Sequence, residues 1–188
     1  MHHPPSHHLV YGELDDYLTG ELLPDTDDER VRQQLARHLV ETLGYAKSEL
    51  EPRRVIDTSF NQMPVRTEIT LTARIDGRRL FILRYAPGSL VTREMAAIAA
   101  ARILEPHYRI PLAIVTNGRD AELLETEHGA VLATGIGCLP DRNQAEQLVR
   151  ECAFLPFADP KKRDQALRIL HLFDQNVCCT DQCQSQQP

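Results

Sequence analysis

The sequence lacks several features that would assign it quickly to a class. No apolar run approaches the roughly 20 residues needed to span a bilayer. The start, MHHPPSHH, has no basic segment followed by an apolar one, which is the mark of a secretory signal. No segment has the form GxxxxGK(S/T) of a phosphate-binding loop. We therefore expect a cytoplasmic protein with no membrane contact and no nucleotide-driven motor.

The sequence also lacks an excess of positive charge. The 21 Lys and Arg residues against 27 Asp and Glu give a formal net charge of −6. The molecule as a whole repels a phosphate backbone, so any nucleic-acid contact must rely on a local patch. Arginines do concentrate in the central segment: Arg53, Arg54, Arg66, Arg74, Arg78, Arg79 and Arg84. They form either such a patch or, more commonly, the solvated face of exposed strands.

The five cysteines do not resemble a disulfide framework, because their number is odd and they bunch near the C-terminus. Three of them lie in the ending NVCCTDQCQ, at Cys178, Cys179 and Cys183. With a fourth ligand from Cys138, Cys152 or His171, these thiolates would suit Zn²⁺ or an iron-sulfur cluster. The alternative is a polar tail with reduced thiols, because the spacing gives no two separated Cys-x-x-Cys pairs.

Length and composition favour one folded domain. A chain of 188 residues with 42% hydrophobic residues can bury its own core. Residues 1–11 begin with a His- and Pro-rich stretch that has little to bury, so we expect a flexible tail there. We expect the domain over 12–175 and a Cys-rich polar tail over 176–188.

The first regular element is an amphipathic helix. Val31, Leu35, Leu39 and Leu43 recur at four-residue spacing, and acidic residues stand at the start of the segment 27–43. Gly44 follows, as at many helix ends. The spacing predicts a helix over 27–43.

Strands follow this helix. VIDTSF, RTEITLTARI and RRLFILRYA are β-rich runs, and Asp76-Gly77 between the last two predicts a hairpin turn. TEITLTARI alternates apolar and polar residues, which predicts one buried and one wet face. LFIL is continuously apolar, as in a central strand covered on both faces.

The second half alternates helices and strands. A helix over 92–104 precedes the apolar strand PLAIVTNG, and this order predicts a parallel crossover. The strands AELLET and GAVLATG and helices over 142–152 and 160–173 complete the order. The fold class is therefore α/β.

Four segments resemble the N-terminal domain of type I restriction enzyme R subunits. They are DDERVRQQLARHLVETLGY, RTEITL, FILRYAPGSL and IPLAIVTNG, and together they fall within roughly residues 12–140. The resemblance implies a PD-(D/E)XK nuclease domain, with a restriction-endonuclease-like three-layer fold in which helices flank a central mixed sheet. By this resemblance Glu29 corresponds to the family's helix glutamate, Gly44 and Tyr45 to its Gly-Tyr pair, and Glu68 to its strand carboxylate.

The last strand departs from the family pattern. Where members read Glu, any residue, Lys, this chain has Leu83, Arg84 and Tyr85 before the shared Ala-Pro turn. Enzymes of this type hold Mg²⁺ with clustered carboxylates, while the lysine orients water and stabilises charge. Leucine binds no hard cation, and tyrosine is neutral at pH 7. An inactive relative, with Mg²⁺ left only a degenerate site, is the simplest account.

Another carboxylate offers an alternative. Glu94 lies in the first turn of the helix 92–104 and would replace the lost ligand if it reached the same cleft, with Arg84 or Arg93 as a fixed cation. Otherwise Glu94, in a first turn with Thr92 at or near the N-cap, only stabilises the helix dipole. Glu29 at a helix start has the same structural alternative, and the alternative for Glu68 is a side chain that points to solvent from an alternating strand.

Three functions remain open. The first is a pseudo-nuclease that binds nucleic acid or protein, with Arg66, Arg84 and Arg93 as DNA contacts. The second is an active Mg²⁺-dependent endodeoxyribonuclease with Glu29, Glu68 and Glu94 as a migrated site. The third is a metal-binding or redox module built on Cys178, Cys179 and Cys183. The sequence does not predict an oligomeric state.

Overall fold

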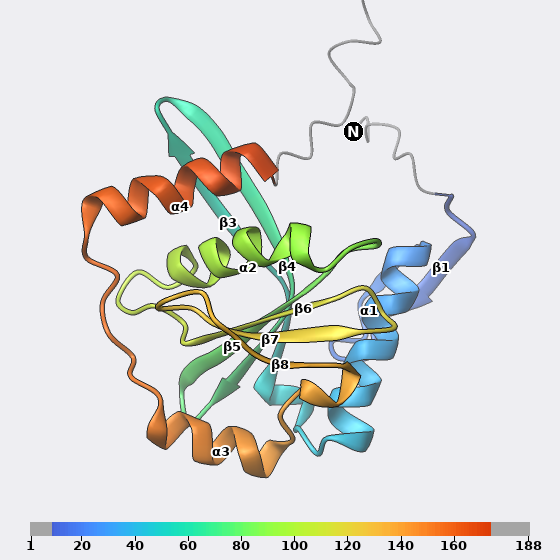
Figure 1. Cartoon of the computed structure of the whole chain (residues 1–188). Coiled ribbons are helices and arrows are strands. Elements are labelled where there is room, and N and C mark those ends of the chain that lie inside the picture. Colours follow the sequence, from blue (N-terminus) through green and yellow to red (C-terminus); the bar gives the residue numbers. More distant parts are fainter. Residues whose placement is uncertain (1–8, 174–188) are drawn as a thin grey trace, which may run out of the picture.

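The computed structural model describes residues 9–173, which alternate strands and helices (Figure 1). The strands are β1 (Gly12–Asp15), β2 (Leu22–Asp25), β3 (Leu50–Phe60), β4 (Met63–Ile75), β5 (Arg78–Tyr85), β6 (Leu112–Thr116), β7 (Ala121–Glu125) and β8 (Val131–Thr134). The α-helices are α1 (Asp27–Arg37), α2 (Val91–Ile103), α3 (Arg142–Glu151) and α4 (Pro160–Phe173). Short helical turns cover His38–Thr42, Lys47–Glu49 and Ile136–Cys138. None of these helices is long and apolar enough to cross a membrane.

The described strands form one six-stranded sheet and one small hairpin. The sheet has the order β3-β4-β5-β6-β7-β8, and β1 pairs with β2 separately. The β5–β6 pair is parallel and is joined through α2, as predicted, whereas the other neighbours in the sheet are antiparallel. The mixed sheet and its flanking helices confirm the α/β prediction.

Apolar side chains cover both faces of the sheet. One core cluster contains residues of α2 and α4, such as Ile98 and Leu170, packed with Ile82 of β5. The other contains residues of α1 and α3, such as Leu35 and Val149, packed with Leu83. Helices thus lie on the two sides of the sheet and make three layers (Figure 1). The apolar run LFIL of β5 is fully buried, which confirms a central strand.

The predicted boundaries hold with local differences. The segment 27–43 forms α1 and then a π-helical turn, and Gly44 follows with a φ of 81°. The Asp76-Gly77 turn joins β4 to β5 with both residues at positive φ, 49° and 80°. On β4 the alternation fails at Thr72, which is buried and donates its hydroxyl to Glu51 at 2.9 Å. The wet face predicted for this strand is therefore wrong at that residue.

The β1–β2 hairpin was not predicted, and it lies against α1. It is held partly by Arg53 of β3, whose backbone has a φ of 52° and which is skipped in the pairing with β4. Its guanidinium reaches Asp16 in the hairpin connection at 2.6 Å and Glu21 at 2.7 Å. This left-handed backbone conformation is uncommon for a residue with a side chain.

Candidate functional site

The sheet opens where β4 and β5 diverge. Their pairing runs only from Leu71 opposite Leu83 to Ile75 opposite Arg78, while β4 continues alongside β3 to the end of the hairpin. At the point of divergence, Thr70 Oγ1 accepts a hydrogen bond of 2.9 Å from the backbone N–H of Tyr85. The β3–β4 hairpin then extends past α4 (Figure 1).

A polar cavity of about 360 Å³ occupies this opening. One wall comes from the start of α1 and the other from β4 and β5, with the lining residues Thr26, Asp28, Glu29, Arg32, Glu68, Thr70, Arg84 and Tyr85. Thr26 sets the position of the helix, because its hydroxyl oxygen accepts the Glu29 backbone N–H at 3.2 Å as an N-cap.

A narrow second pocket of about 30 Å³ adjoins the cavity. It shares Arg84 and Tyr85 with the cavity and adds Arg93 from the first turn of α2. The structure thus brings together several residues singled out in the sequence: Glu29, Glu68, Arg84 and Tyr85, with Arg93 beside them.

Glu29 lies in the cavity wall but is engaged within its own helix. Its two carboxylate oxygens accept hydrogen bonds from Arg32, at 3.1 Å from Nε and at a shorter distance from Nη2. Gln33 Nε2 donates to the same carboxylate at 2.6 Å. Glu29 is therefore a member of an ion-pair network, whereas the sequence predicted either a catalytic carboxylate or a residue that stabilises the helix dipole.

Asp16 completes this network and was missed in the sequence. Its side chain is 1% exposed and its Oδ2 pairs with Arg32 at 3.1 Å and with Arg53 at 2.6 Å. Burial alone would raise the pKa of Asp16, but hydrogen bonds from Arg53, from the backbone of Thr19 and Leu18, and from Arg32 lower it below its usual range. The carboxylate is thus charged at neutral pH.

The two positions of the family's Glu-x-Lys pair have different surroundings. Leu83 is fully buried among the side chains under α1 and α3. Tyr85 lines the cavity and is partly buried. Burial, together with the negative charges of Asp28 and Asp27, raises the pKa of the Tyr85 hydroxyl. The hydroxyl therefore stays protonated at neutral pH and can donate a hydrogen bond.

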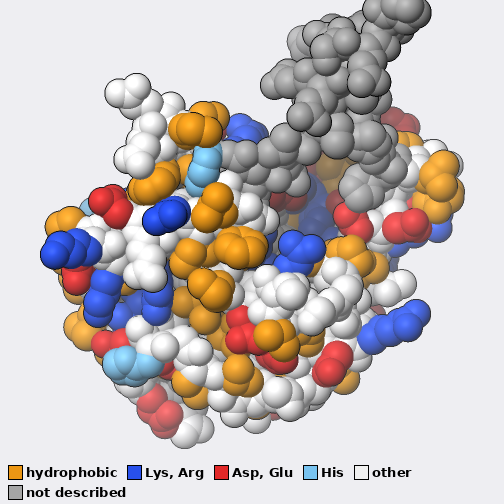
Figure 2. All heavy atoms as spheres, turned by 45° about the horizontal axis from the view of Figure 1, so that its top comes forward, with side chains coloured by type: hydrophobic (Ala, Val, Ile, Leu, Met, Phe, Trp, Pro, Cys, Tyr) orange, Lys and Arg blue, Asp and Glu red, His pale blue; other side chains and the backbone are white. Residues whose placement is uncertain are grey.

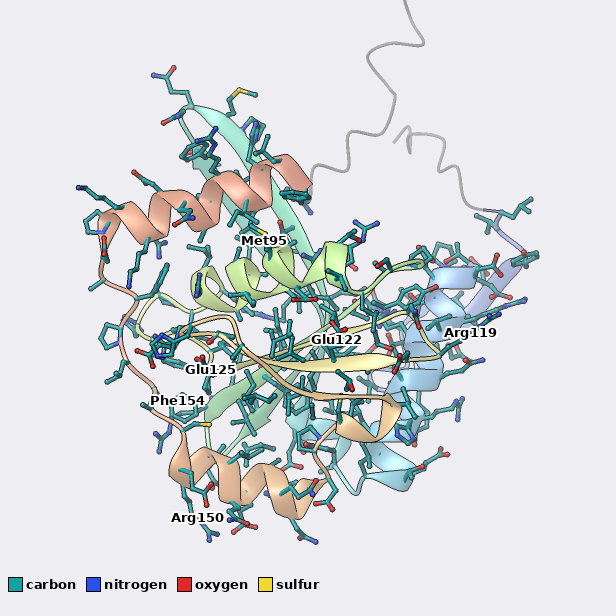
Figure 3. All side chains as sticks on the ribbon, in the orientation of Figure 1. Met95, Arg119, Glu122, Glu125, Arg150 and Phe154 are labelled. Carbon is teal, nitrogen blue, oxygen red and sulfur yellow. The ribbon has the colours of Figure 1, made fainter. Side chains whose placement is uncertain are left out.

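Glu94 does not line the cavity. It faces Glu122 of β7, which Figure 3 shows between α2 and the sheet. Burial, the negative charge of Glu94, a hydrogen bond with Glu94 and the charge of Asp120 raise the pKa of Glu122. The helix itself begins at Val91 with Leu90 at the N-cap, and Glu94 lies in its first turn as predicted. Thr92 lies near the N-cap and donates its hydroxyl to the Ser89 carbonyl at 2.9 Å.

Most arginines of the central segment are engaged in the protein itself. Arg66 pairs with Asp57 at 3.2 Å on the exposed part of the β3–β4 hairpin, away from the cavity lining. Arg79 pairs with Glu51 and Glu105, and Arg78 lies over the ring of Phe154. On the face shown in Figure 2, Lys and Arg side chains of the described residues lie scattered among acidic and apolar ones and form no continuous basic surface.

The metal-ligating residue types do not gather elsewhere in the described part of the chain. Residues 9–173 contain no group of three His, Cys, Asp or Glu side chains arranged to hold a metal ion. Cys138 and Cys152 are partly buried free thiols, and burial raises the pKa of each. Cys178, Cys179 and Cys183 lie outside the described residues.

The fold and the site define a three-layer α/β domain with a polar cavity at the division of its central sheet. Residues 27–140 match the family described as the type I restriction enzyme R protein N terminus. This match covers more than half of the 188 residues, and the chain belongs to that family. No curated protein and no solved structure matches the chain. The resemblance noted in the sequence is thereby confirmed at the level of the family.

Proposed function

We propose that this chain is a nucleic-acid-binding pseudo-nuclease: it keeps the PD-(D/E)XK scaffold but cuts no phosphodiester bond. The observation that carries the proposal lies at the end of β5. Leu83 is buried in the core and Tyr85 stands in the cavity wall, at the two positions where the resemblance requires a metal-binding glutamate and a lysine. Neither side chain holds a hard cation or supplies a positive charge.

The remaining carboxylates support the loss of cutting. Glu29 would have to give up its hydrogen bonds from Arg32 and Gln33 to bind a metal ion. Glu94 faces Glu122 and not the cavity. Asp28 and Glu68 are the other carboxylates of the cavity wall, and no lysine stands among the lining residues to orient the attacking water and stabilise charge.

Nucleic acid is the ligand best supported by the surroundings of the cavity. The family is named for a subunit of DNA restriction enzymes. The guanidinium groups of Arg84 and Arg93 line the narrow pocket next to the cavity, and arginine pairs well with phosphate through two parallel hydrogen bonds. A protein partner is the competing ligand, and binding measurements separate the two.

A cleavage assay tests the loss of activity. Plasmid and single-stranded DNA are incubated with the purified protein in Mg²⁺ or Mn²⁺, alongside the double variant Glu68→Ala, Glu94→Ala. We expect no cleavage by either protein. Cleavage by the natural chain that disappears in the double variant would contradict the proposal and establish a migrated deoxyribonuclease site.

A binding assay tests the ligand. Fluorescence anisotropy of labelled DNA is measured without divalent metal for the natural chain and the double variant Arg84→Ala, Arg93→Ala. We expect the variant to bind at least about tenfold more weakly, with a salt dependence shallower by about two phosphate contacts. The control is Arg150→Ala, on α3 (Figure 3), because Arg150 lines neither the cavity nor the narrow pocket. Equal effects of the two variants, or no DNA binding at all, would refute the proposed ligand.

The metal or redox function of Cys178, Cys179 and Cys183 stays a prediction, because these residues lie outside the described part. Thermal unfolding with added Zn²⁺ or with a chelator tests it, since a structural metal contributes directly to folding stability.

A further inference from the structure

The chemistry of the cavity differs from that of a phosphate site. Its wall carries the carboxylates of Asp28 and Glu68 and the guanidinium of Arg84. Glu68 is exposed, and no hydrogen bond or ion pair of its side chain occurs within residues 9–173. Two carboxylates repel a phosphate that brings no metal ion with it. The cavity wall also differs from a site for a cation alone, because the guanidinium of Arg84 stands in it.

Such a wall suits a neutral group that has donors and acceptors side by side. Carboxylates accept hydrogen bonds, and Arg84 donates them. The Thr70 oxygen accepts the Tyr85 backbone N–H at 2.9 Å, which leaves its hydroxyl hydrogen to donate. The edges of nucleobases present this alternation of amino groups, ring nitrogens and carbonyl oxygens. A volume of about 360 Å³ lies at the lower end of the range for small-ligand sites.

We propose that the cavity receives one unstacked nucleobase of a single-stranded nucleic acid, with the ring of Tyr85 as its stacking surface. Tyr85 is the aromatic residue of the cavity lining, and it lines the narrow pocket as well. Stacking of a base on an aromatic side chain tolerates any sequence, because every base has a flat face. The inference rests on the proposed nucleic-acid binding and specifies which form of nucleic acid the site takes.

The side chains around the narrow pocket beside Tyr85 suit an adjacent phosphate at the surface. Arg84 and Arg93 line it, and the first turn of α2 lies there with no side chain capping its N-terminus. Backbone N–H groups at such an end attract anions, and here two guanidinium groups add to the attraction. The base site and the phosphate site thus share Arg84 and Tyr85, as neighbouring parts of one nucleotide require.

The charge of the molecule favours a single strand over a duplex. A duplex is held mainly by a row of phosphate contacts, whereas the formal net charge is −6 and the face in Figure 2 shows no continuous basic surface. Stacking adds affinity for a single strand beyond its phosphate contacts, so a short basic site beside an aromatic ring contributes more to binding a single strand than a duplex.

The test compares two changes at one residue. Tyr85→Leu removes the ring, and Tyr85→Phe keeps it. Anisotropy is measured in EDTA for labelled 12-nucleotide single strands and for the matching duplex, and 2-aminopurine within the strand reports stacking through quenching of its fluorescence. We expect Tyr85→Leu to weaken single-strand binding roughly 5- to 150-fold and to abolish the quenching. Tyr85→Phe should bind within about threefold of the natural chain. Circular dichroism melts show that each variant folds.

Other outcomes would overturn the inference in distinguishable ways. Equal binding of single strand and duplex, unchanged by Tyr85→Leu, would reject the nucleobase site and leave the proposed function intact. No binding of either nucleic acid would reject both. Tyr85-dependent binding of an octa-arginine peptide, with no binding of the oligonucleotides, would assign the cavity to basic side chains of a protein partner instead.

Discussion

Glu29 receives hydrogen bonds on both carboxylate oxygens from the guanidinium of Arg32, three residues further along α1. The same guanidinium reaches back to Asp16, so one arginine joins the first helix to the β1–β2 hairpin. Glu29 therefore helps to hold the wall of the cavity together.

Because of this role, we expect substitution of Glu29 to lower the free energy of unfolding much more than substitution of Glu68 in the same cavity. Glu29→Ala leaves Arg32, whose side chain is 6% exposed, with only part of its charge compensated. We expect a loss of about 2–3 kcal/mol in the free energy of unfolding. Glu68→Ala, at an exposed residue, should change it by less than about 0.5 kcal/mol. Urea unfolding of both variants measures the difference, and equal effects would contradict the structural role of Glu29.

Asp16 predicts how stability depends on pH. Its pKa is lower in the folded chain than the value of about 3.9 expected for the unfolded chain. The unfolded chain therefore binds more protons in acid, and stability falls as the pH drops below about 5. Asp16→Asn should be less stable than the natural chain at pH 7 and should lose less stability on acidification. Asp57→Asn, on the exposed hairpin, is the control and should follow the natural chain.

For Glu122 we expect the opposite dependence of folding stability on pH. Its pKa is raised by burial and by Glu94, so the folded chain holds its proton to higher pH than the unfolded chain does. Its contribution to stability is therefore lost as the pH rises above about 4.3. Glu122→Gln should raise the melting temperature at pH 7 but not at pH 4. The same change at the exposed Glu13 serves as the control. A variant that melts lower than the natural chain at pH 7 would contradict the shift.

We expect removal of the Tyr45 hydroxyl, shortly after the first helix, to lower the stability of the fold. Its hydroxyl donates to the Pro140 carbonyl at 2.8 Å inside the core, and its ring meets Phe81 edge-on. Tyr45→Phe keeps the ring but leaves a buried acceptor without its donor, so we expect a loss of about 1–2 kcal/mol. Tyr11→Phe, at an exposed tyrosine, should cost less than about 0.5 kcal/mol. Thermal and urea unfolding compare the two.

The burial of Leu83 leads us to expect that a glutamate at this position destabilises the fold. Its side chain is fully buried among apolar neighbours, so Leu83→Glu places a carboxyl group there with no partner. We expect a loss of about 3 kcal/mol or more, whereas Leu83→Met should cost less than about 1.5 kcal/mol. Glutamate tolerated as well as methionine would contradict the burial of this residue in an apolar core.

Local patterns account for the elements that the sequence predicted. Apolar spacing predicted α1, and the Asp76-Gly77 pair predicted the turn between β4 and β5. Both elements were predictable because they depend on residues that are neighbours in the sequence. The charge network was not predictable in this way, since Asp16 lies 16 residues from Arg32 and 37 from Arg53. The β1–β2 hairpin that carries Asp16 is short, with four-residue strands that give little periodicity.

The candidate site was predictable only where family resemblance fixed the residues. Glu29, Glu68 and Tyr85 do line one cavity. The position of Glu94 depended on which residue of β7 comes to lie under α2, and this register is set by the whole sheet. Asp28 and Arg32 were not singled out, because next to other charged residues at a helix start they give no distinctive signal.

The divergence of β4 from β5 gives the recess a backbone origin. Its shape is fixed by where two strands stop pairing and by how a helix is capped, and not by the acidic or basic groups inside it. Substitutions can therefore exchange the chemistry of its walls while the hollow itself persists. The same recess can in this way be adapted to a different ligand one side chain at a time.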